Sequence, residues 1–411
     1  MTVTVAVFIV VYLGMMLGRL PGLKVDRSAI ALLGAIVLVA SDEISEKQAV
    51  GFIGPDTISL LFGLMIVSSQ FTLSGFYGEV TRRLVSLHVG PRTLLALLVV
   101  VPGVMAALLT NDVIALAMAP LIVQLCVERR LNPVPYLLAM ACSVNAGSTA
   151  TIIGSPQNML IGQHMDLSFG GFMVYTAVPA LLALAVIWLL ICFLYRDQWE
   201  LPGSVQGERA ETYRFDRLES AKGLVITVVI VGIFLFTDWP RELVALAAGG
   251  FLLMNAHFQS RKMLDHVDWQ LLILFISLFV VNGAFQQTHL PQQWVDSLQT
   301  HGIDFQHPAT LFITTFLLSD LVSNVPAVML LLPYAKDVIT GPAMALAAGM
   351  ASNLIIIGSI ANIIVVEAAA RYGVTISFRE HARTGVPVTL LSLLIAAGWL
   401  WFIFVSGTAG Q

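Results

Sequence analysis

The pentapeptide Gly154-Ser155-Pro156-Gln157-Asn158 and its counterpart Gly358-Ser359-Ile360-Ala361-Asn362 decide the fold that this sequence predicts. Each Gly-Ser-x-x-Asn element interrupts a long apolar run, the first near 134–163 and the second near 342–370. Glycine, proline and small polar residues inside such a run interrupt the helix. Because the same element stands at the same place in both halves of the chain, it indicates an internal repeat, which neither copy would indicate alone.

Two other apolar stretches, 93–127 and 308–335, are also broken in the middle by polar residues. The first contains Thr110-Asn111-Asp112, and the second contains Ser323-Asn324-Val325-Pro326. Each stretch is either a pair of spanning helices or a re-entrant hairpin that returns to the side from which it entered. The distribution of charge between the loops distinguishes these two readings.

The composition requires a membrane. Hydrophobic residues make up 57% of the 411 and charged residues only 11%, whereas about a quarter of the residues in soluble domains are charged. The first apolar run, 3–17, has neither a preceding basic residue nor a cleavage site, so it predicts a first membrane helix and argues against a signal peptide. The net charge of -4 does not suggest a nucleic-acid partner. The three cysteines are irregularly spaced inside apolar runs, so we expect them to pack as small hydrophobic residues and not to form disulfides or a metal site. They are Cys126, Cys142 and Cys192.

The remaining apolar runs predict ten membrane helices, near 2–18, 28–41, 56–76, 134–163, 172–195, 222–238, 242–256, 268–286, 342–370 and 384–406. The one long polar segment, 196–222, is expected to be a cytoplasmic linker. It separates repeat 1 (1–195) from repeat 2 (223–411). The predicted fold is therefore an all-α integral membrane protein of two inverted five-helix repeats, each with a re-entrant hairpin and a broken helix.

Loop charge supports this inverted arrangement. Cytoplasmic loops collect Lys and Arg. With both termini external and both hairpins re-entrant, only Lys47, Arg241 and Lys336 of the 21 basic residues fall outside. The first hairpin then enters from the cytoplasm and the second from outside, as an inverted repeat requires. The expected location is the cell inner membrane.

Irregular backbone at membrane depth must face protein or a watery cavity. We therefore expect the two hairpin tips and the two helix breaks to meet near the midplane, where they can bind an ion or an oxygen-rich solute. The alternative for each break is a simple kink or a tight helix contact. The candidate binding residues are Thr110, Asn111, Asp112, Gly154, Ser155, Asn158, Ser323, Asn324, Gly358, Ser359 and Asn362.

Ionisable residues inside the apolar runs are candidates for ion coupling. Asp112 is a proton carrier or a cation ligand, or alternatively the N-cap of the helix that follows. Asp320 and Glu367 are either coupling sites or ion-pairing residues near helix ends. Sodium could bind at Asn111 and Asn324. No cofactor is expected, because the chain has no metal-ligand His pair, no Gly-x-Ser-x-Gly elbow and no Walker-type phosphate loop. These absences argue against an enzyme.

The runs 109–113 and 145–158 resemble the ion transporter superfamily, as do 323–326, 358–362 and the closing 376–390. That group contains ArsB arsenite permeases, citrate transporters, divalent anion:sodium symporters and NhaD-type sodium/proton antiporters. The resemblance covers nearly the whole chain and implies an alternating-access carrier, elevator-type or related, with its sites at the hairpin tips.

The resemblance also bears on the substrate. Divalent anion:sodium symporters carry Ser-Asn-Thr at each tip, whereas Asp112 and Val325 stand at the two Thr positions here. An ionised Asp112 would repel a dianion, and no Lys or Arg is expected nearby to offset it. An Asn-Asp tip is more similar to ArsB and implies a neutral or weakly acidic hydroxylated solute.

The leading hypothesis is therefore proton-coupled efflux of arsenite, antimonite or a similar small inorganic solute. Sodium-coupled uptake of a small inorganic or organic anion and sodium/proton antiport stay open. So does a membrane subunit of an ATPase-driven pump, for which 196–222 would be the docking segment. A homodimer is a further open alternative.

Overall fold

The structure is a computed structural model that describes residues 2–18, 25–200, 214–255 and 257–406. The central part of the predicted linker 196–222, residues 201–213, lies outside the described residues. The described chain is almost entirely helical, and one isolated β-bridge joins Leu131 to Glu200. The all-helical fold predicted from the sequence is confirmed.

In the described ranges the helices are α1 (Thr2–Leu17), α2 (Arg27–Ala40), α3 (Glu46–Phe52), α4 (Pro55–Leu73), α5 (Phe76–Ser86), α6 (Pro91–Leu108), α7 (Asn111–Glu128), α8 (Pro133–Ser148), η1 (Ile152–Gly154), α9 (Pro156–His164), α10 (Phe169–Leu194), α11 (Arg217–Phe236), α12 (Arg241–Leu253), α13 (Ser260–Asp265), α14 (Trp269–Gln286), α15 (Leu290–Thr300), α16 (Pro308–Val322), α17 (Asn324–Leu331), η2 (Leu332–Tyr334), α18 (Thr340–Ala351), η3 (Ile356–Gly358), α19 (Ile360–Arg371) and α20 (Phe378–Val405). Seven of them, α4, α6, α7, α10, α11, α14 and α20, are long and apolar enough to cross a membrane.

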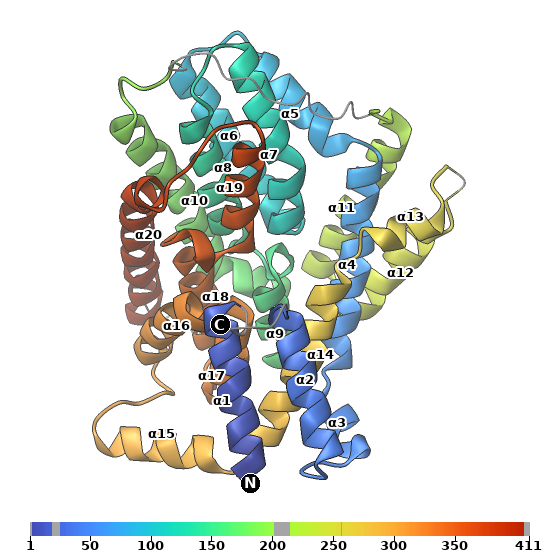
Figure 1. Cartoon of the computed structure of the whole chain (residues 1–411), viewed down its shortest axis with the longest axis vertical. Helices are drawn as coiled ribbons and strands as arrows, with labels where there is room; N and C mark the ends of the chain where they lie inside the picture. The colour runs from blue at the N-terminus through green and yellow to red at the C-terminus, as the bar shows by residue number, and fades with distance from the viewer. Residues whose placement is uncertain (1, 19–24, 201–213, 256, 407–411) are drawn as a thin grey trace.

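The order of elements in α1–α10 recurs in α11–α20. Each half has two helices, a short helix, a long helix and a further short helix. A hairpin, a helix broken by a 3-10 turn and a long closing helix follow. In Figure 1 the first hairpin (α6–α7) lies in the upper half of the molecule and the second (α16–α17) in the lower half. The short helices α3, α5, α13 and α15 were not predicted, because none of them forms a long apolar run. The membrane orientation of the halves and the domain bounds stay predictions.

The halves interleave rather than standing side by side. Helix α4 packs against α12 of the other half, and α14 packs against α2. Likewise α10 packs against α20, α7 against α19, and each hairpin against the broken helix of its own half. We call α1–α4 with α11–α14 the scaffold bundle, and α6–α10 with α16–α20 the core bundle.

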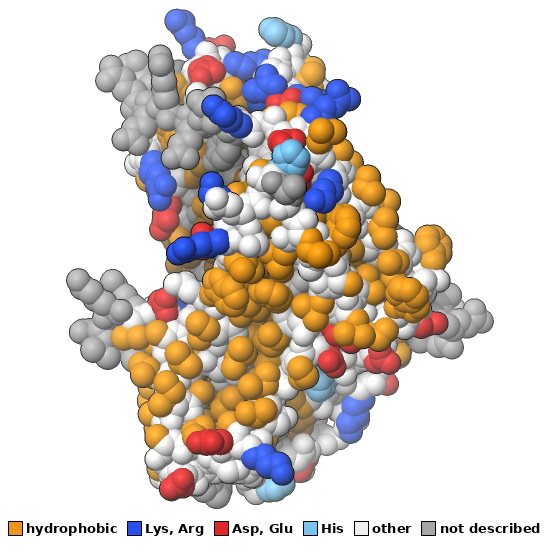
Figure 2. Space-filling view, turned by 90° about the vertical axis from the view of Figure 1, so that its right-hand side faces the viewer, with side chains coloured by type: hydrophobic (Ala, Val, Ile, Leu, Met, Phe, Trp, Pro, Cys, Tyr) orange, Lys and Arg blue, Asp and Glu red, His pale blue; other side chains and the backbone are white. Residues whose placement is uncertain are grey.

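The surface agrees with a membrane setting. Figure 2 shows hydrophobic side chains spread over a broad area, below an end where Lys and Arg side chains gather. Arg82 and Arg83, which pair with Glu79 at 2.5 and 2.6 Å, belong to α5, which lies at the upper end of Figure 1. The positive-inside rule places the cytoplasm at such an end.

Candidate functional site

The two helix breaks are built alike, residue by residue. Asn158 Nδ2 donates to the carbonyls of Ser148 (3.1 Å) and Thr151 (2.9 Å). Asn362 Nδ2 donates to the carbonyls of Ser352 (2.7 Å) and Ile355 (3.2 Å). These carbonyls lie at the ends of α8 and α18, where helical hydrogen bonds stop. The Asn of each Gly-Ser-x-x-Asn element is therefore a clamp that satisfies the broken backbone.

The Ser of each element starts the next helix. Ser155 has φ −151° and ψ 152°, and Ser359 has φ −146° and ψ 141°. This extended backbone separates each 3-10 turn from the helix that follows. Gly154 is needed because a Cβ at this position would lie 2.2 Å from the carbonyl oxygen of Ser148. The two breaks were predicted from sequence, and the structure shows how local hydrogen bonds hold them.

Asn145 connects the two breaks at the centre of the core bundle. Its Nδ2 donates to Oδ1 of Asn353 (3.0 Å) and Oδ1 of Asn362 (3.2 Å). Its Oδ1 accepts from Ser359 Oγ (2.9 Å) and, at 3.4 Å, from Asn111 Nδ2. One buried amide thus joins α8, the second break and the first hairpin tip. Asn145 and Asn353 were missed as site residues, although Asn145 belongs to the run 145–158.

The second hairpin tip is held differently. Asn324 Nδ2 donates to Ser352 Oγ at 2.8 Å, and its buried Oδ1 has no hydrogen-bond partner among the described residues. Ser323 has φ 78° and ψ 157°, a region that residues other than Gly rarely adopt. The equivalent Thr110 has an ordinary φ of −65°. The second tip therefore has a free acceptor and a strained backbone.

A cavity of about 760 Å³ brings the tips and breaks together. The helices α7, α9, α17 and α19 all begin at it, so four helix N-termini and their N–H groups converge on one space. From the core bundle it is lined by Asn111, Asp112, Pro156, Gln157, Ser323, Asn324, Val325, Pro326, Ile357, Gly358, Ser359, Ile360, Ile363 and Glu367. The scaffold bundle adds Met15, Met16, Leu17, Gly18, Asp26, Arg27, Ser28, Asp268, Gln270, Leu271 and Leu274.

The predicted site residues divide into two groups. Seven line the cavity, namely Asn111, Asp112, Ser323, Asn324, Gly358, Ser359 and Glu367. The others lie behind its wall, namely Thr110, Gly154, Ser155, Asn158, Asp320 and Asn362. Thr110, for example, donates to Ser68 Oγ of α4 at 3.3 Å. Thr110 also stands at the N-cap position of α7, which leaves Asp112 in the first turn with its side chain at the cavity.

The charged side chains of the cavity include one cation that the sequence analysis placed only in a loop. Arg27 begins α2 and lines the same cavity as Asp112, although no ion pair joins the two side chains among the described residues. Two other carboxylates there are helix caps. Asp26 accepts from Ala29 N and Asp268 from Leu271 N, both at 2.9 Å. In the sequence, Asp26 and Asp268 show only the pattern of helix N-cap residues. That pattern does not indicate that the two residues line the same cavity.

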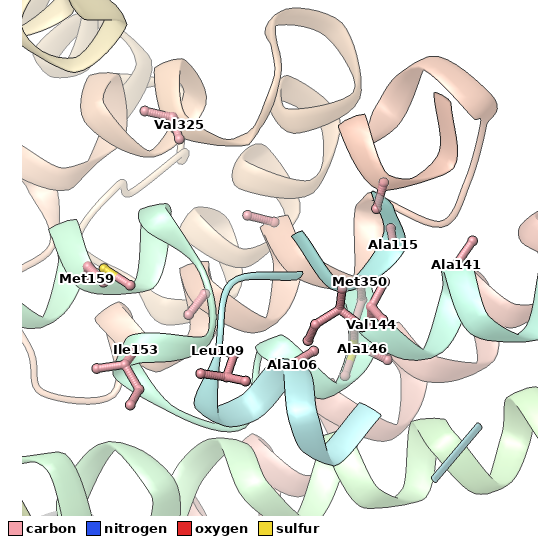
Figure 3. Close-up of a cluster of buried hydrophobic side chains, with 14 of the residues drawn as sticks. Ala106, Leu109, Ala115, Ala141, Val144, Ala146, Ile153, Met159, Val325 and Met350 are labelled. Atoms are coloured by element: carbon pink, nitrogen blue, oxygen red, sulfur yellow. The ribbon is translucent and has the colours of Figure 1, made fainter. Parts of the chain in front are cut away.

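A tightly packed apolar layer supports the site. Figure 3 shows Leu109 of the first tip among small side chains of α6, α7 and α8, including Ala106, Ala115 and Ala146. Met350 of α18 belongs to the same cluster and is fully buried. Because small residues let backbones approach closely, both halves contribute to this layer beneath the tips.

Some polar contacts between the bundles lie away from the cavity rim. Gln163 Nε2, just before the end of α9, donates to Glu242 Oε2 of α12 at 3.1 Å. Arg241 of α12 lies 4.0 Å from Asp166. The exposed rim of the cavity, in contrast, consists of Asp26, Asp268, Gln270, Glu367 and neighbouring residues. These contacts therefore connect the core bundle to the scaffold bundle away from the rim.

Comparison with known proteins identifies the kind of molecule. Residues 12–344 match the citrate transporter family. A 46 kDa membrane protein of Mycobacterium leprae is 26% identical over 98% of this chain and 99% of its own length. The silicon efflux transporter LSI3 of Oryza sativa subsp. japonica is 27% identical over 90% of this chain and 91% of its own.

A solved structure supports the fold. The YdaH transporter of Alcanivorax borkumensis, whose topology is described as unusual, matches with a TM-score of 0.62 over 98% of both chains. At 13% sequence identity this match bears on the fold alone. The predicted resemblance to ion transporters is confirmed by the family match. This chain belongs to the citrate transporter family and is a multi-pass secondary transporter.

Proposed function

We propose that this transporter exchanges a small, neutral, hydroxylated solute, of the arsenous or silicic acid type, for protons. The observation that carries the proposal is the cavity, where four helix N-termini meet the carboxyl group of Asp112. The N–H groups can donate to oxygen atoms of the solute, while the carboxylate and amide oxygens accept from its hydroxyl groups. A polyhydroxylated neutral molecule matches both kinds of partner.

The charges of the cavity support a neutral solute over a polyanion. Asp26, Asp112, Asp268 and Glu367 line it together with the single cation Arg27. A dianion or trianion would meet an excess of negative charge at low dielectric, which is unfavourable. A related protein is named a silicon efflux transporter, and silicic acid is a neutral hydroxylated molecule.

Asp112 is the proposed proton carrier. It stands at the first tip, beside Asn111, and faces the cavity where solute and water can reach it. Protonation of Asp112 would change the charge of the site between the two halves of the transport cycle. In the predicted topology the cavity rim is cytoplasmic, so the structure would represent a state that loads solute or releases protons inside.

A second candidate is sodium-coupled uptake of a small monovalent anion, which Arg27 favours. Its side chain makes no ion pair within 4 Å among the described residues. Arg27 could therefore pair with an anion at the helix N-termini. The free Oδ1 of Asn324 would then be a sodium ligand.

The test is transport in proteoliposomes that contain the purified full chain. Arsenite, antimonite, silicic acid, chloride and citrate are offered separately, under a proton gradient and then under a sodium gradient. We expect uphill movement of the neutral acids under the proton gradient. The Asp112→Asn variant should lose this accumulation but keep solute exchange, because exchange needs no change of charge.

Asp216→Asn is the matched control, since Asp216 caps α11 outside the cavity lining and Asn caps a helix about as well as Asp. It should transport like the wild type. Sodium-driven movement of an anion that depends on Arg27, with no movement of the neutral acids, would replace the proposal by the second candidate.

A further inference from the structure

Asp320 is a buried carboxyl group outside the cavity lining. It belongs to α16 and precedes the second hairpin tip by one turn. Both of its carboxyl oxygens are buried, and neither has a hydrogen-bond partner among the described residues. Ser319 and Thr315 of the same helix also have buried, unpartnered hydroxyl groups. No hydrogen bond to a described residue therefore explains why the Asp320 carboxyl group is buried.

Among the described residues, the helices that pack most closely against α16 carry no charged side chain. Helix α16 packs against α1, α17, α18 and η3. Of these four elements, only α1 carries a titratable side chain, Tyr12. The Tyr12 hydroxyl is already bonded to Asn282 Oδ1 (2.8 Å) and to the Pro326 carbonyl (3.2 Å). An ionised Asp320 would therefore stand at membrane depth without a counter-charge, which strongly favours the protonated acid.

Gly358 lies beside Asp320 at the cavity wall. Gly358 lines the cavity, and a Cβ at Gly358 would lie 3.1 Å from Asp320 Oδ1. In the other half, the equivalent Gly154 would instead meet the carbonyls of Ser148 and Ala106, and Gly154 does not line the cavity. The buried carboxyl group thus occurs in the half whose break glycine lines the cavity.

The backbone near Asp320 is strained at the second hairpin tip. Ser323, three residues on, holds the strained φ of 78°. A change in this tip, or in the η3 turn, would expose Asp320 to cavity water. From these observations we propose that Asp320 is a second proton-binding site. It holds a proton while Gly358 covers it and exchanges that proton with cavity water when the second hairpin moves.

The exchange is a simple acid dissociation. The Asp320 O–H bond breaks, its electron pair stays on the carboxylate, and the proton passes to water in the cavity. The proposal rests on the proposed function in one respect, because it makes Asp320 a second coupling group of the same cycle. It predicts one more proton per solute than Asp112 alone can carry.

Infrared spectroscopy of the full chain in lipid tests the site without any solute. The wild type at neutral pH should show a carbonyl band of a protonated carboxyl group. The band is measured in the Asp112→Asn variant, so that a proton on Asp112 does not contribute to it. Adding Asp320→Asn should then remove the band, whereas adding the neighbouring control Ser319→Ala should keep it. A band that persists in the folded Asp112→Asn, Asp320→Asn variant would overturn the proposal.

Gly358→Ala is the second variant, because it keeps the Asp320 carboxyl group and adds a Cβ between that group and the cavity. The Asp320 band should persist and shift more slowly than in the wild type when the sample is moved to heavy water. An unchanged exchange rate would show that the proton does not pass Gly358. This measurement also covers the case in which Asp320→Asn does not fold.

Transport then separates this proposal from the proposed function. With a neutral acid as solute, Asp320→Asn should move one proton fewer per solute than the wild type. A wild type that moves no neutral acid would refute the proposed function, yet the infrared result would still stand. An unchanged proton count in Asp320→Asn would refute the coupling role of Asp320 alone.

Discussion

The two hairpins match at their tips but carry their buried or tip carboxyl groups at different positions. When Thr110 is aligned with Ser323, Asn111 coincides with Asn324. Asp112 then coincides with Val325, and Asp320 coincides with Ala107. Each hairpin therefore carries one carboxyl group within one turn of its tip, at a position where the other has an apolar residue.

This difference distinguishes the residues that hold the backbone from the carboxyl groups that are proposed to bind protons. The residues that hold the backbone, such as Asn158 and Asn362, are the same in both halves because each broken helix leaves the same carbonyls unpaired. The carboxyl groups are free to differ because they do not hold the fold. We infer that a duplication produced the backbone arrangement common to both halves. Later substitutions in one half or the other then introduced the proposed proton-binding residues Asp112 and Asp320.

The largest expected effect comes from removing the clamps. Asn158→Ala removes the donor to the carbonyls of Ser148 and Thr151. Asn362→Ala removes the donor to the Ser352 carbonyl, whereas the Ile355 carbonyl keeps its bond from Gly358 N and Asn145 Nδ2 keeps its bond to Asn353. An unpaired buried group costs roughly 1–3 kcal/mol, so we expect a loss of roughly 2–4 kcal/mol, larger for Asn158. Thermal unfolding of the purified variants in detergent measures this difference. Equal stability of Asn158→Ala and wild type would show that the break does not need its clamp.

A smaller effect is expected at the tips. Asn111→Ala and Asn324→Ala should weaken solute or ion binding and leave a folded protein, because both side chains line the cavity. The loss of one polar ligand, roughly 1–3 kcal/mol, corresponds to up to about a hundredfold in affinity. Binding is measured by calorimetry or by the concentration dependence of transport. Gln299→Ala, on the exposed surface of α15 and outside the cavity lining, is the control. If both Asn variants bind like the wild type, the tips are not part of the site.

The fold could be predicted because its decisive signals are local. A polar break inside an apolar run is visible in a single segment, and matching Thr110-Asn111 with Ser323-Asn324 needs no structure. The short helices α5 and α15 could not be predicted in this way. Each has 11 residues, too few to span a membrane, and they lie between the longer apolar runs.

The site was only partly predictable because much of it forms between the halves. Asn145 bonds to Asn353 and Asn362, more than 200 positions away. No periodicity in either segment indicates that contact. Arg27 was assigned to a loop by the positive-inside rule, which reports the side of the membrane and not the cavity that a residue lines. Packing between the bundles decides both cases.

The smallest effect is expected at Ser323, where the tips differ in backbone strain. Its φ of 78° suits glycine, so Ser323→Gly should be more stable than Ser323→Ala by about 1 kcal/mol, since both variants lack the hydroxyl group. Thr110, at φ −65°, gives the matched comparison. Both positions are helix N-caps, where glycine is itself favoured over alanine. The preference for glycine should therefore be larger at Ser323 than at Thr110 by about 1 kcal/mol, because only Ser323 has a positive φ. Thermal unfolding of the four variants measures both differences, and equal differences at the two tips would mean that Ser323 is not strained.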